Sequence, residues 1–328
     1  MQNGVTFWTE GGSSIGMGHV MRCINIAHAL ETDSGMPMHF LVNNERPVID
    51  RLNDESLFHI VYPMTGRHAD RLTNGVVVID TKRDVSAQVR ALREEGRKVV
   101  LIDNSSTGEA DAIVMPSPVY KGQESAKVHY GRHYLIIGEN FRRERSPKPA
   151  RHAAPLKVLV TMGGSDPFSL TENVLKSLWN TEGIEVTTVV GPAFKMTETM
   201  EEFMKMGNGK FKFVFNVKNM APLMRDAHIA FTAVGTTVYE LAYMGVPSVL
   251  IGNYESDAED LASLEGLGIC KSLGFYRDVV SSKITEAAEL FRDDAALWRG
   301  MVMNARGLTD GDGASRIASL INSLIQQN

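Results

Sequence analysis

The chain of 328 residues has few cysteines, no excess of basic residues and no long hydrophobic run. Its two cysteines, Cys23 and Cys270, lie far apart in apolar segments and show none of the spacings typical of metal sites, which indicates a reducing compartment. The formal net charge of −5 argues against nucleic acid as the main partner, because phosphate backbones select basic surfaces.

We also expect no segment that would direct the chain to or through a membrane. No basic residue precedes Arg22 and the first residues contain no long apolar core, so we expect no signal peptide. Aliphatic runs such as 76–79 and 99–102 are only four residues long, whereas a bilayer span needs about 20. We therefore expect a cytoplasmic enzyme without membrane insertion.

Short apolar segments alternate with segments of helical periodicity along most of the chain. Strands that are apolar on both faces and alternate with helices form parallel sheets covered by those helices, so the pattern predicts an α/β fold. In the first half we expect strands at 5–9, 38–42, 58–62, 76–80 and 99–103, and helices at 19–30 and 86–95. In the second half we expect strands at 157–161, 185–190, 211–215, 229–232 and 248–251, and helices at 170–179, 197–206, 236–244 and from about 255.

The chain divides in a segment rich in charge, proline and small residues, 142–155, which reads as a linker. Its length also favours two domains of about 150 residues. We expect two Rossmann-like domains, 1–145 and 155–310, whose strand ends face each other across a cleft, followed by a terminal helix at 311–328. The tail from Ser281 is expected to be helical throughout.

Three glycine loops each follow a predicted strand: 10–18, 162–167 and 233–237. Glycine lets the backbone approach a ligand closely, and the helix that follows offers free N–H groups and a positive dipole end. Each loop alone could be a simple turn. Three loops at the same topological position, two of them with hydroxyl groups, favour phosphate binding.

Two common nucleotide motifs are absent. A dinucleotide fingerprint needs a third glycine and an acid after the next strand, but Met21 stands at the glycine position and Asn43-Asn44 follow the strand. No G-K-[ST] sequence occurs, which excludes a P-loop. No carboxylate pair has convincing ligand spacing either, so we expect neither a cofactor nor a metal.

The loop at 233–237 has two interpretations. Thr237 and Glu240 match a capping box, in which Glu240 only satisfies the backbone at the helix start. Alternatively Gly235, Thr236 and Thr237 surround a phosphate, and Glu240, one turn further on, accepts hydrogen bonds from a ribose diol.

Three motifs together resemble a known family: Ile15-Gly16-Met17-Gly18-His19-Val20-Met21-Arg22-Cys23, then Met162-Gly163-Gly164-Ser165-Asp166-Pro167, then the segment 235–247. The chain resembles the UDP-2,4-diacetamido-2,4,6-trideoxy-β-L-altropyranose hydrolases of pseudaminic acid biosynthesis and the related spore-coat polysaccharide proteins. More distantly it is similar to the N-acetylglucosaminyltransferase of peptidoglycan synthesis, which has the GT-B fold. The resemblance extends to residues 310–316, before the last helix.

This resemblance implies a GT-B-like arrangement in which the C-terminal domain holds UDP. Glu240 would then hold the ribose, residues 216–220 would frame the uracil, and His19 would activate the water that attacks the anomeric carbon. His19 could instead only cap its helix. The implied catalytic residues are His19, Asn253 and Asp80. The implied substrate-binding residues are Gly16, Gly18, Arg22, Lys82, Gly163, Gly164, Ser165, Gly235, Thr236, Thr237 and Glu240.

The chain departs from the family pattern at two positions that would face the sugar. Lys82 stands where the family usually has an aromatic residue, and Asn253-Tyr254 replaces the family's Asn-Gln pair. Lys82 could therefore meet a carboxylate or a phosphate. Asp80 and Asp103, at predicted strand ends, are either site residues or loop caps.

Three functions remain open from the sequence. The first is a hydrolase that cleaves a UDP-linked amino sugar, and the second is a GT-B glycosyltransferase in which an acceptor hydroxyl replaces water. The third is a UDP-sugar-binding protein without catalysis. The N-terminal half has no obvious basic amphipathic helix, which favours a soluble substrate.

Overall fold

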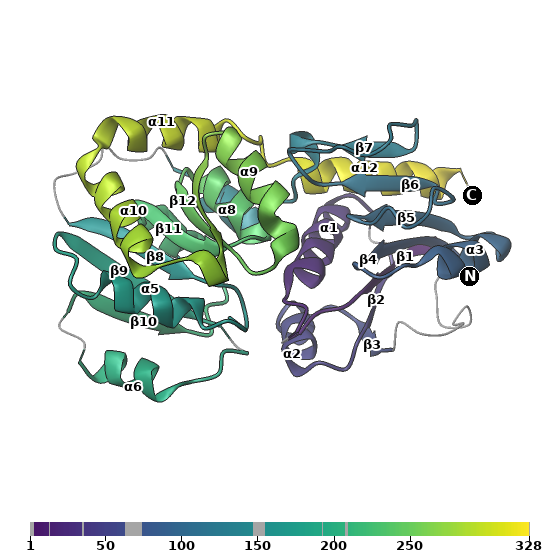
Figure 1. The fold of residues 1–328 in the computed structure, drawn as a ribbon. Coiled ribbons are helices and arrows are strands. Elements are labelled where there is room, and N and C mark those ends of the chain that lie inside the picture. Colours follow the sequence, from purple (N-terminus) through teal and green to yellow (C-terminus); the bar gives the residue numbers. More distant parts are fainter. Residues whose placement is uncertain are drawn as a thin grey trace. The chain divides into compact units, whose positions relative to one another are not determined.

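The computed structural model describes residues 3–12, 14–34, 36–62, 74–146, 155–191, 193–206 and 209–327. The chain forms two compact units (Figure 1), one of Met1–Gly138 with Thr309–Asn328 and one of Glu139–Leu308. Among the described helices, none is both long enough and apolar enough to cross a bilayer.

The first unit is built on a seven-stranded parallel sheet with the strand order β3-β2-β1-β4-β5-β6-β7. Thr9 lies opposite Asp80, and Asp80 lies opposite Ile102, so β1, β4 and β5 end at one level. Side chains that follow these strands therefore gather at one edge. The strands are β1 (Asn3–Thr9), β2 (Met38–Val42), β3 (His59–Val61), β4 (Asn74–Asp80), β5 (Lys98–Ile102), β6 (Ala112–Met115) and β7 (Val128–Tyr130).

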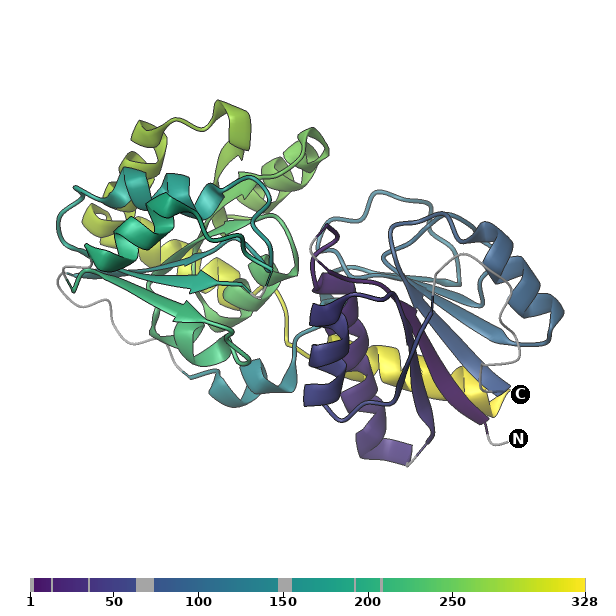
Figure 2. The ribbon, with the colours of Figure 1, turned by 90° about the horizontal axis from the view of Figure 1, so that it is seen from below.

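Helices cover both faces of this sheet, which explains why its central strands are apolar throughout. Val76 and Val78 of β4 pack on one face with residues of α1 (Gly18–Ser34), α2 (Arg46–Asp54) and α12 (Gly313–Gln326). Val77 and Ile79 pack on the other face with residues of α3 (Ser86–Glu94). Figure 2 shows α12 running along the sheet, and α12 contacts α1.

The return of the chain to this unit depends on residues 310–316. A Cβ on Gly313 would lie 2.2 Å from the carbonyl oxygen of Leu135, so only glycine permits this approach of the two backbones. Arg316 donates two hydrogen bonds to Asp310, at 2.8 and 2.7 Å, and one to the carbonyl oxygen of His133. This segment, which contributes to the family resemblance, thus anchors α12 to the first unit.

The second unit has a six-stranded parallel sheet with the order β10-β9-β8-β11-β12-β13. Thr232 pairs with Thr161, and Ala233 with Ile251, so the loops after β8, β11 and β12 lie at one edge. The strands are β8 (Leu156–Thr161), β9 (Ile184–Val190), β10 (Phe211–Phe215), β11 (Ile229–Ala233), β12 (Ser248–Gly252) and β13 (Cys270–Phe275). The helices are α4 (Glu139–Glu144), α5 (Leu170–Leu178), α6 (Glu198–Lys205), α7 (Ala221–Asp226), α8 (Thr236–Met244), α9 (Ala258–Gly266), α10 (Ser281–Asp293) and α11 (Ala295–Arg306).

The predicted α/β fold with two parallel sheets is confirmed, and two local predictions are wrong. The tail from Ser281 is not helical throughout, because α10 ends before Asp294, which caps α11, and residues 307–312 are not helical. The predicted linker begins inside α4, since Arg142–Glu144 are helical, while residues 147–154 lie outside the described residues.

Candidate functional site

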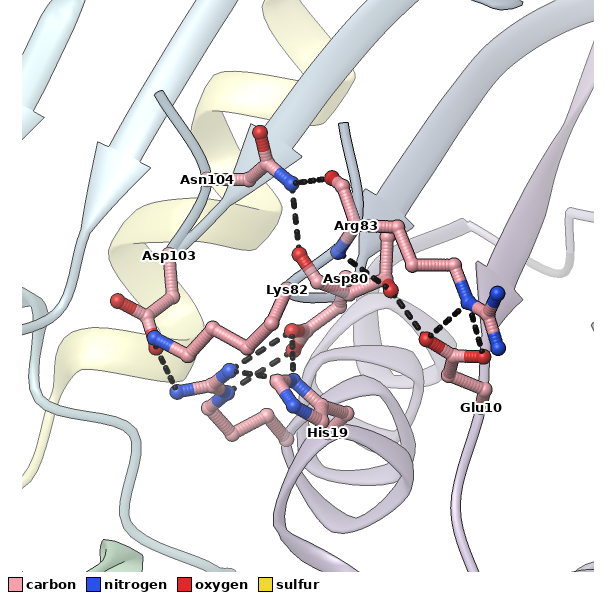
Figure 3. A network of polar contacts seen from close by, with 9 residues as sticks. Glu10, His19, Asp80, Lys82, Arg83, Asp103 and Asn104 are labelled. Carbon is pink, nitrogen blue, oxygen red and sulfur yellow. Dashed lines mark hydrogen bonds and ion pairs between the residues drawn. The ribbon is translucent and has the colours of Figure 1, made fainter. Parts of the chain in front are cut away.

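The carboxyl edge of the first sheet carries a network of charged side chains (Figure 3). Glu10 follows β1, Asp80 ends β4, and Asp103 follows β5. His19 and Arg22 lie three residues apart in the first turns of α1, so they share one face of the helix. The sequence predictions His19, Arg22, Asp80 and Lys82 are thus brought together.

The glycine loop before α1 fixes where His19 lies. Gly12 and Gly16 exchange two backbone hydrogen bonds, at 3.0 and 2.7 Å. Their φ angles of +128° and +82° lie in the region that favours glycine, so the loop can close and α1 begins at Gly18. His19 therefore follows directly from a turn that needs glycine.

His19 and Asp80 form a buried pair. His19 Nδ1 lies 2.6 Å from Asp80 Oδ1, and Arg22 donates to the same carboxylate through Nη2 at 2.7 Å and Nε at 2.9 Å. Arg22 Nη2 also lies 2.8 Å from His19 Nδ1. A carboxylate only accepts, so without a hydrogen Nδ1 would face the Asp80 oxygen lone pair to lone pair at 2.6 Å. We therefore assign the ring hydrogen to Nδ1, which donates to Asp80 Oδ1, while Arg22 Nη2 donates to the same oxygen and not to the ring. His19 Nε2 is then left with its lone pair. The His19 ring bonds the Asp80 side chain and not the backbone at the start of α1, which argues against a role as a helix cap.

Arg22 links this pair to Asp103. Its Nη1 donates to Asp103 Oδ2 at 2.9 Å, and Lys82 Nζ donates to the same oxygen at 2.8 Å. Burial by itself would lower the pKa of Arg22, but the two carboxylates raise it well above its usual range. Burial opposes ionisation of Asp103 as well, and the two cations nevertheless lower its pKa. Both groups are therefore charged at neutral pH.

A further set of contacts, which the sequence analysis did not identify, supports Asp80 and Lys82. Thr81 Oγ1 donates to Glu10 at 2.5 Å, and Arg83 Nε donates to both Glu10 oxygens at 2.9 and 3.0 Å. Asn104 Nδ2 donates to the carbonyl oxygens of Thr81 and Arg83. Glu10 could have been found as a carboxylate at the end of an apolar strand, the same signal that identified Asp80.

In the second unit the loop after β8 is held in a fixed shape. Gly163 has a φ of +83°, and the Gly164 carbonyl oxygen accepts a hydrogen bond from Ala193 N at 2.9 Å. Asp166 accepts from the backbone N–H groups of Leu170 and Thr171, both at 2.8 Å, at the start of α5. These contacts fix both ends of the loop. Ser165, which is predicted to bind the ligand, lies between Gly164 and Asp166, so its position is fixed as well.

The structure excludes one of the two interpretations of Glu240, and its contact with a ribose stays a prediction. Helix α8 begins at Thr236 and no side chain caps it, so Glu240 lies within the helix and the capping-box interpretation is wrong. The Glu240 carboxyl is half-buried and has no hydrogen-bond or ion-pair partner among the described residues. Burial raises its pKa to about 7.

Gly235, directly before α8, has no structural need to be glycine. Its φ of 164° is extended backbone, which any residue adopts, and an added Cβ would meet no atom within 4 Å. Neither backbone strain nor packing in the described protein therefore explains the missing side chain. Close approach of a ligand to the start of α8 stays a prediction.

Asn253 and Tyr254 follow β12 at the same edge of the second sheet. Their backbone N–H groups donate to Asp257 at 2.8 and 3.0 Å. The side-chain oxygen Oδ1 of Asn253 is buried and has no hydrogen-bond partner among the described residues, which is costly unless a ligand supplies a donor. The segment 216–220 follows β10 at this edge too, and its contact with uracil stays a prediction.

The predicted residues thus form two groups, one at the carboxyl edge of each sheet. The first unit holds Gly16, Gly18, His19, Arg22, Asp80 and Lys82, and the second holds Gly163, Gly164, Ser165, Gly235, Thr236, Thr237, Glu240 and Asn253. Over the described ranges, no three histidine, cysteine, aspartate or glutamate side chains are grouped so that they could hold a metal ion.

Comparisons with known proteins show which domains and chains this protein resembles. Residues 158–262 match the glycosyltransferase family 28 C-terminal domain. The chain is 27% identical over 271 residues to an uncharacterized protein of Methanocaldococcus jannaschii, covering 76% of this chain and 56% of that protein, so it spans about half of that relative. It is 24% identical over an alignment of 342 residues to the spore coat polysaccharide biosynthesis protein SpsG of Bacillus subtilis strain 168, covering 98% and 99% of the two chains.

A solved structure supports the fold. The crystal structure of MurG from Acinetobacter baumannii matches with a TM-score of 0.69 at 15% identity, covering 98% of this chain and 99% of that one. At this identity the similarity shows the fold alone. The predicted GT-B-like architecture is thereby confirmed, and the second unit contains the part similar to a glycosyltransferase domain.

Proposed function

We propose that this protein hydrolyses a UDP-linked amino sugar at its sugar–phosphate bond and releases UDP and the free sugar. The observation that carries the proposal is the buried His19–Asp80 pair, in which Nδ1 is fixed as a donor and Nε2 is left as a base. A histidine whose tautomer is set by a carboxylate is a common general base at neutral pH. The resemblance to UDP-sugar hydrolases in the 15–23 motif supports the same assignment.

In the proposed reaction, water attacks the anomeric carbon. His19 Nε2 takes a proton from the water while a bond forms between its oxygen and the carbon, and the bond from carbon to the phosphate oxygen breaks. Asp80 and Arg22 hold the imidazole and stabilise the positive charge that it gains. UDP leaves with the bonding electrons and needs no proton if N–H and hydroxyl donors meet its charge.

We assign binding of the nucleotide to the second unit. The backbone at Gly163, Gly164 and Ser165 and the start of α8 at Thr236 and Thr237 offer neutral donors and a positive helix dipole to the diphosphate. The unpartnered Glu240 carboxylate would accept two hydrogen bonds from the ribose diol, and buried Asn253 Oδ1 would accept one from a sugar hydroxyl. Among the described residues Asn253 Oδ1 has no hydrogen-bond partner, burial is what raises the pKa of Glu240, and Gly163 and Gly235 face open space.

Glycosyl transfer is the second candidate, because residues 158–262 match a glycosyltransferase domain. The same base would then deprotonate an acceptor hydroxyl in place of water. The two functions share the nucleotide site and the histidine, so only the nucleophile distinguishes them.

We expect the protein to release UDP from at least one of a panel of UDP-sugars without any acceptor, in amounts equal to the free sugar. Full turnover is expected in excess chelator, because Asp80 and Asp103 are already occupied by Arg22 and Lys82 and the diphosphate is assigned neutral donors. Chromatographic quantification of UDP and sugar tests both points. UDP release only when an acceptor is supplied would establish a transferase, and turnover restored by magnesium after chelation would refute the metal-free mechanism.

Glu240→Gln should weaken UDP binding by about 1–3 kcal/mol, the range for a buried hydrogen-bonding group that loses a partner. Because the diol bonds the ionised carboxylate, UDP affinity of the wild type should fall as the pH drops below the raised pKa of about 7. Calorimetry of UDP binding from pH 5.5 to 8.5 measures both effects. Glu198→Gln, on an exposed part of α6, is the matched control and should change neither.

The same substitution should stabilise the fold at high pH. Between the ordinary glutamate pKa of 4.5 and about 7, the folded state holds a proton that the unfolded state has lost, so stability falls as the pH rises through this range. Glu240→Gln lacks this loss, and its free energy of unfolding at pH 8 should exceed that of the wild type by about 1–3 kcal/mol. A less stable variant with unchanged UDP affinity would make Glu240 a structural residue.

A further inference from the structure

At the carboxyl edge of the first sheet, acidic and basic side chains differ in how far they are exposed. Among the acids, Glu10, Asp80 and Asp103 have side chains only 5%, 0% and 21% exposed. Lys82 and Arg83 have side chains 68% and 56% exposed. The acids therefore lie beneath the surface and the cations lie above them, so this edge presents positive charge to a ligand.

Lys82 is available for a further partner. Its ammonium group has three N–H bonds, and among the described contacts one is used, toward Asp103 Oδ2. That oxygen already accepts from Arg22, whose side chain is only 11% exposed, so the partly buried Asp103 carboxylate keeps a cation without Lys82. An exposed ion pair of this kind contributes little to folding stability.

The direction of Lys82 distinguishes it from Arg83. In Figure 3 the two side chains extend to opposite sides, Lys82 toward Asp103 and Arg83 toward Glu10. Arg22 joins Asp103 directly to Asp80 through hydrogen bonds of 2.9 and 2.7 Å, and Asp80 in turn bonds His19 at 2.6 Å. The Lys82 ammonium is thus part of the network that holds the proposed base, whereas Arg83 is held by both oxygens of Glu10.

We propose that the sugar of the UDP-linked substrate carries a carboxylate and that Lys82 binds it. This inference rests on the proposed function, in which His19 acts at the anomeric carbon, so that groups of its network contact the sugar. The diphosphate is assigned its own neutral donors in the second unit and does not require this lysine. An ammonium group with free N–H bonds beside the reacting carbon selects an acidic sugar over its neutral analogue, since a charge-assisted hydrogen bond forms only with the acid.

Two matched pairs of substrates test the proposal. UDP-N-acetylglucosaminuronate and UDP-N-acetylglucosamine are amino sugars, as the proposed function requires, and UDP-glucuronate and UDP-glucose are the corresponding pair without the amino group. The members of each pair differ only at C6 of the sugar, which is a carboxylate in the acid and a hydroxymethyl group in the neutral sugar. We expect the wild type to favour the acid in at least one pair by about 10- to 100-fold, both in kcat/KM for UDP release and in Kd. Lys82→Gln should bring this ratio close to one, and Lys82→Arg should retain most of it.

Lys98→Gln is the control, because Lys98 also pairs with an aspartate, Asp111, but lies at the amino end of β5, away from the site edge. It should leave the ratio unchanged. No preference for the acid in either pair would overturn the proposal. If Lys82→Gln lowers kcat/KM equally on acid and neutral substrates, the proposal is overturned as well. Lys82 would then contact the diphosphate. If the pH profile also changes, Lys82 would instead influence the protonation of His19.

The proposed function and this inference can fail separately. If no UDP-sugar is hydrolysed, the hydrolase proposal fails, and the Kd values then decide the inference. Tighter binding of the acid by the wild type but not by Lys82→Gln would support it, and equal affinities in both proteins would refute it.

Discussion

His19→Asn is expected to lower UDP-sugar turnover by roughly 10²- to 10⁴-fold, the usual range for loss of a general base, while UDP affinity stays close to that of the wild type. The two effects should separate because the base belongs to the first unit and the nucleotide is assigned to the second. Asparagine can still donate toward Asp80, so the buried carboxylate keeps a partner and the fold should be maintained. The variant removes the basic Nε2.

Single-turnover measurements together with UDP calorimetry test this expectation. His28→Asn provides the matched control, since His28 lies on the same helix, is partly exposed and pairs with Glu55 outside the site. It should keep wild-type turnover. Joint loss of affinity and turnover in His19→Asn would make His19 a phosphate-binding or packing residue, and unchanged turnover would make it a structural one.

Asp80→Asn should reduce turnover by about 10³- to 10⁴-fold although the base itself remains. The asparagine amide can donate to His19 Nδ1, which would place the ring hydrogen on Nε2 and leave no lone pair toward the water. The substitution also removes the two-point contact with buried Arg22, at 2.7 and 2.9 Å. We expect the free energy of unfolding to fall by about 3 kcal/mol, as is typical when a buried ion pair loses one partner.

Turnover per folded molecule, with stability measured by denaturant titration, separates the two effects. Asp111→Asn is the control, because Asp111 accepts a hydrogen bond from Val99 N at the opposite end of the sheet and pairs only weakly with nearby cations. It should lower stability without lowering turnover.

The double variant His19→Asn/Asp80→Asn should have a turnover only slightly lower than that of either single variant, since the two side chains act as one unit. Additive losses would show that they act independently.

The sequence by itself determined the architecture, because the signals for it are local. Runs such as Val76–Ile79 are apolar at consecutive positions, and such strands are stable only between two layers of helices. The strand–glycine–helix order at 5–19 also determined that His19 lies in the first turn of a helix at the edge of a sheet. Even there the boundaries shifted: the predicted helix 19–30 runs from Gly18 to Ser34.

The tertiary structure decided the chemistry of the site, because its partners are distant in sequence. His19 and Asp80 are 61 residues apart, and Arg22 and Asp103 are 81 apart, so no periodicity could pair them. The position of Glu240 within α8 depended on where the helix begins, which excluded the capping box. The last helix joined the first unit because Gly313 allows two backbones to meet, a contact that only folding creates.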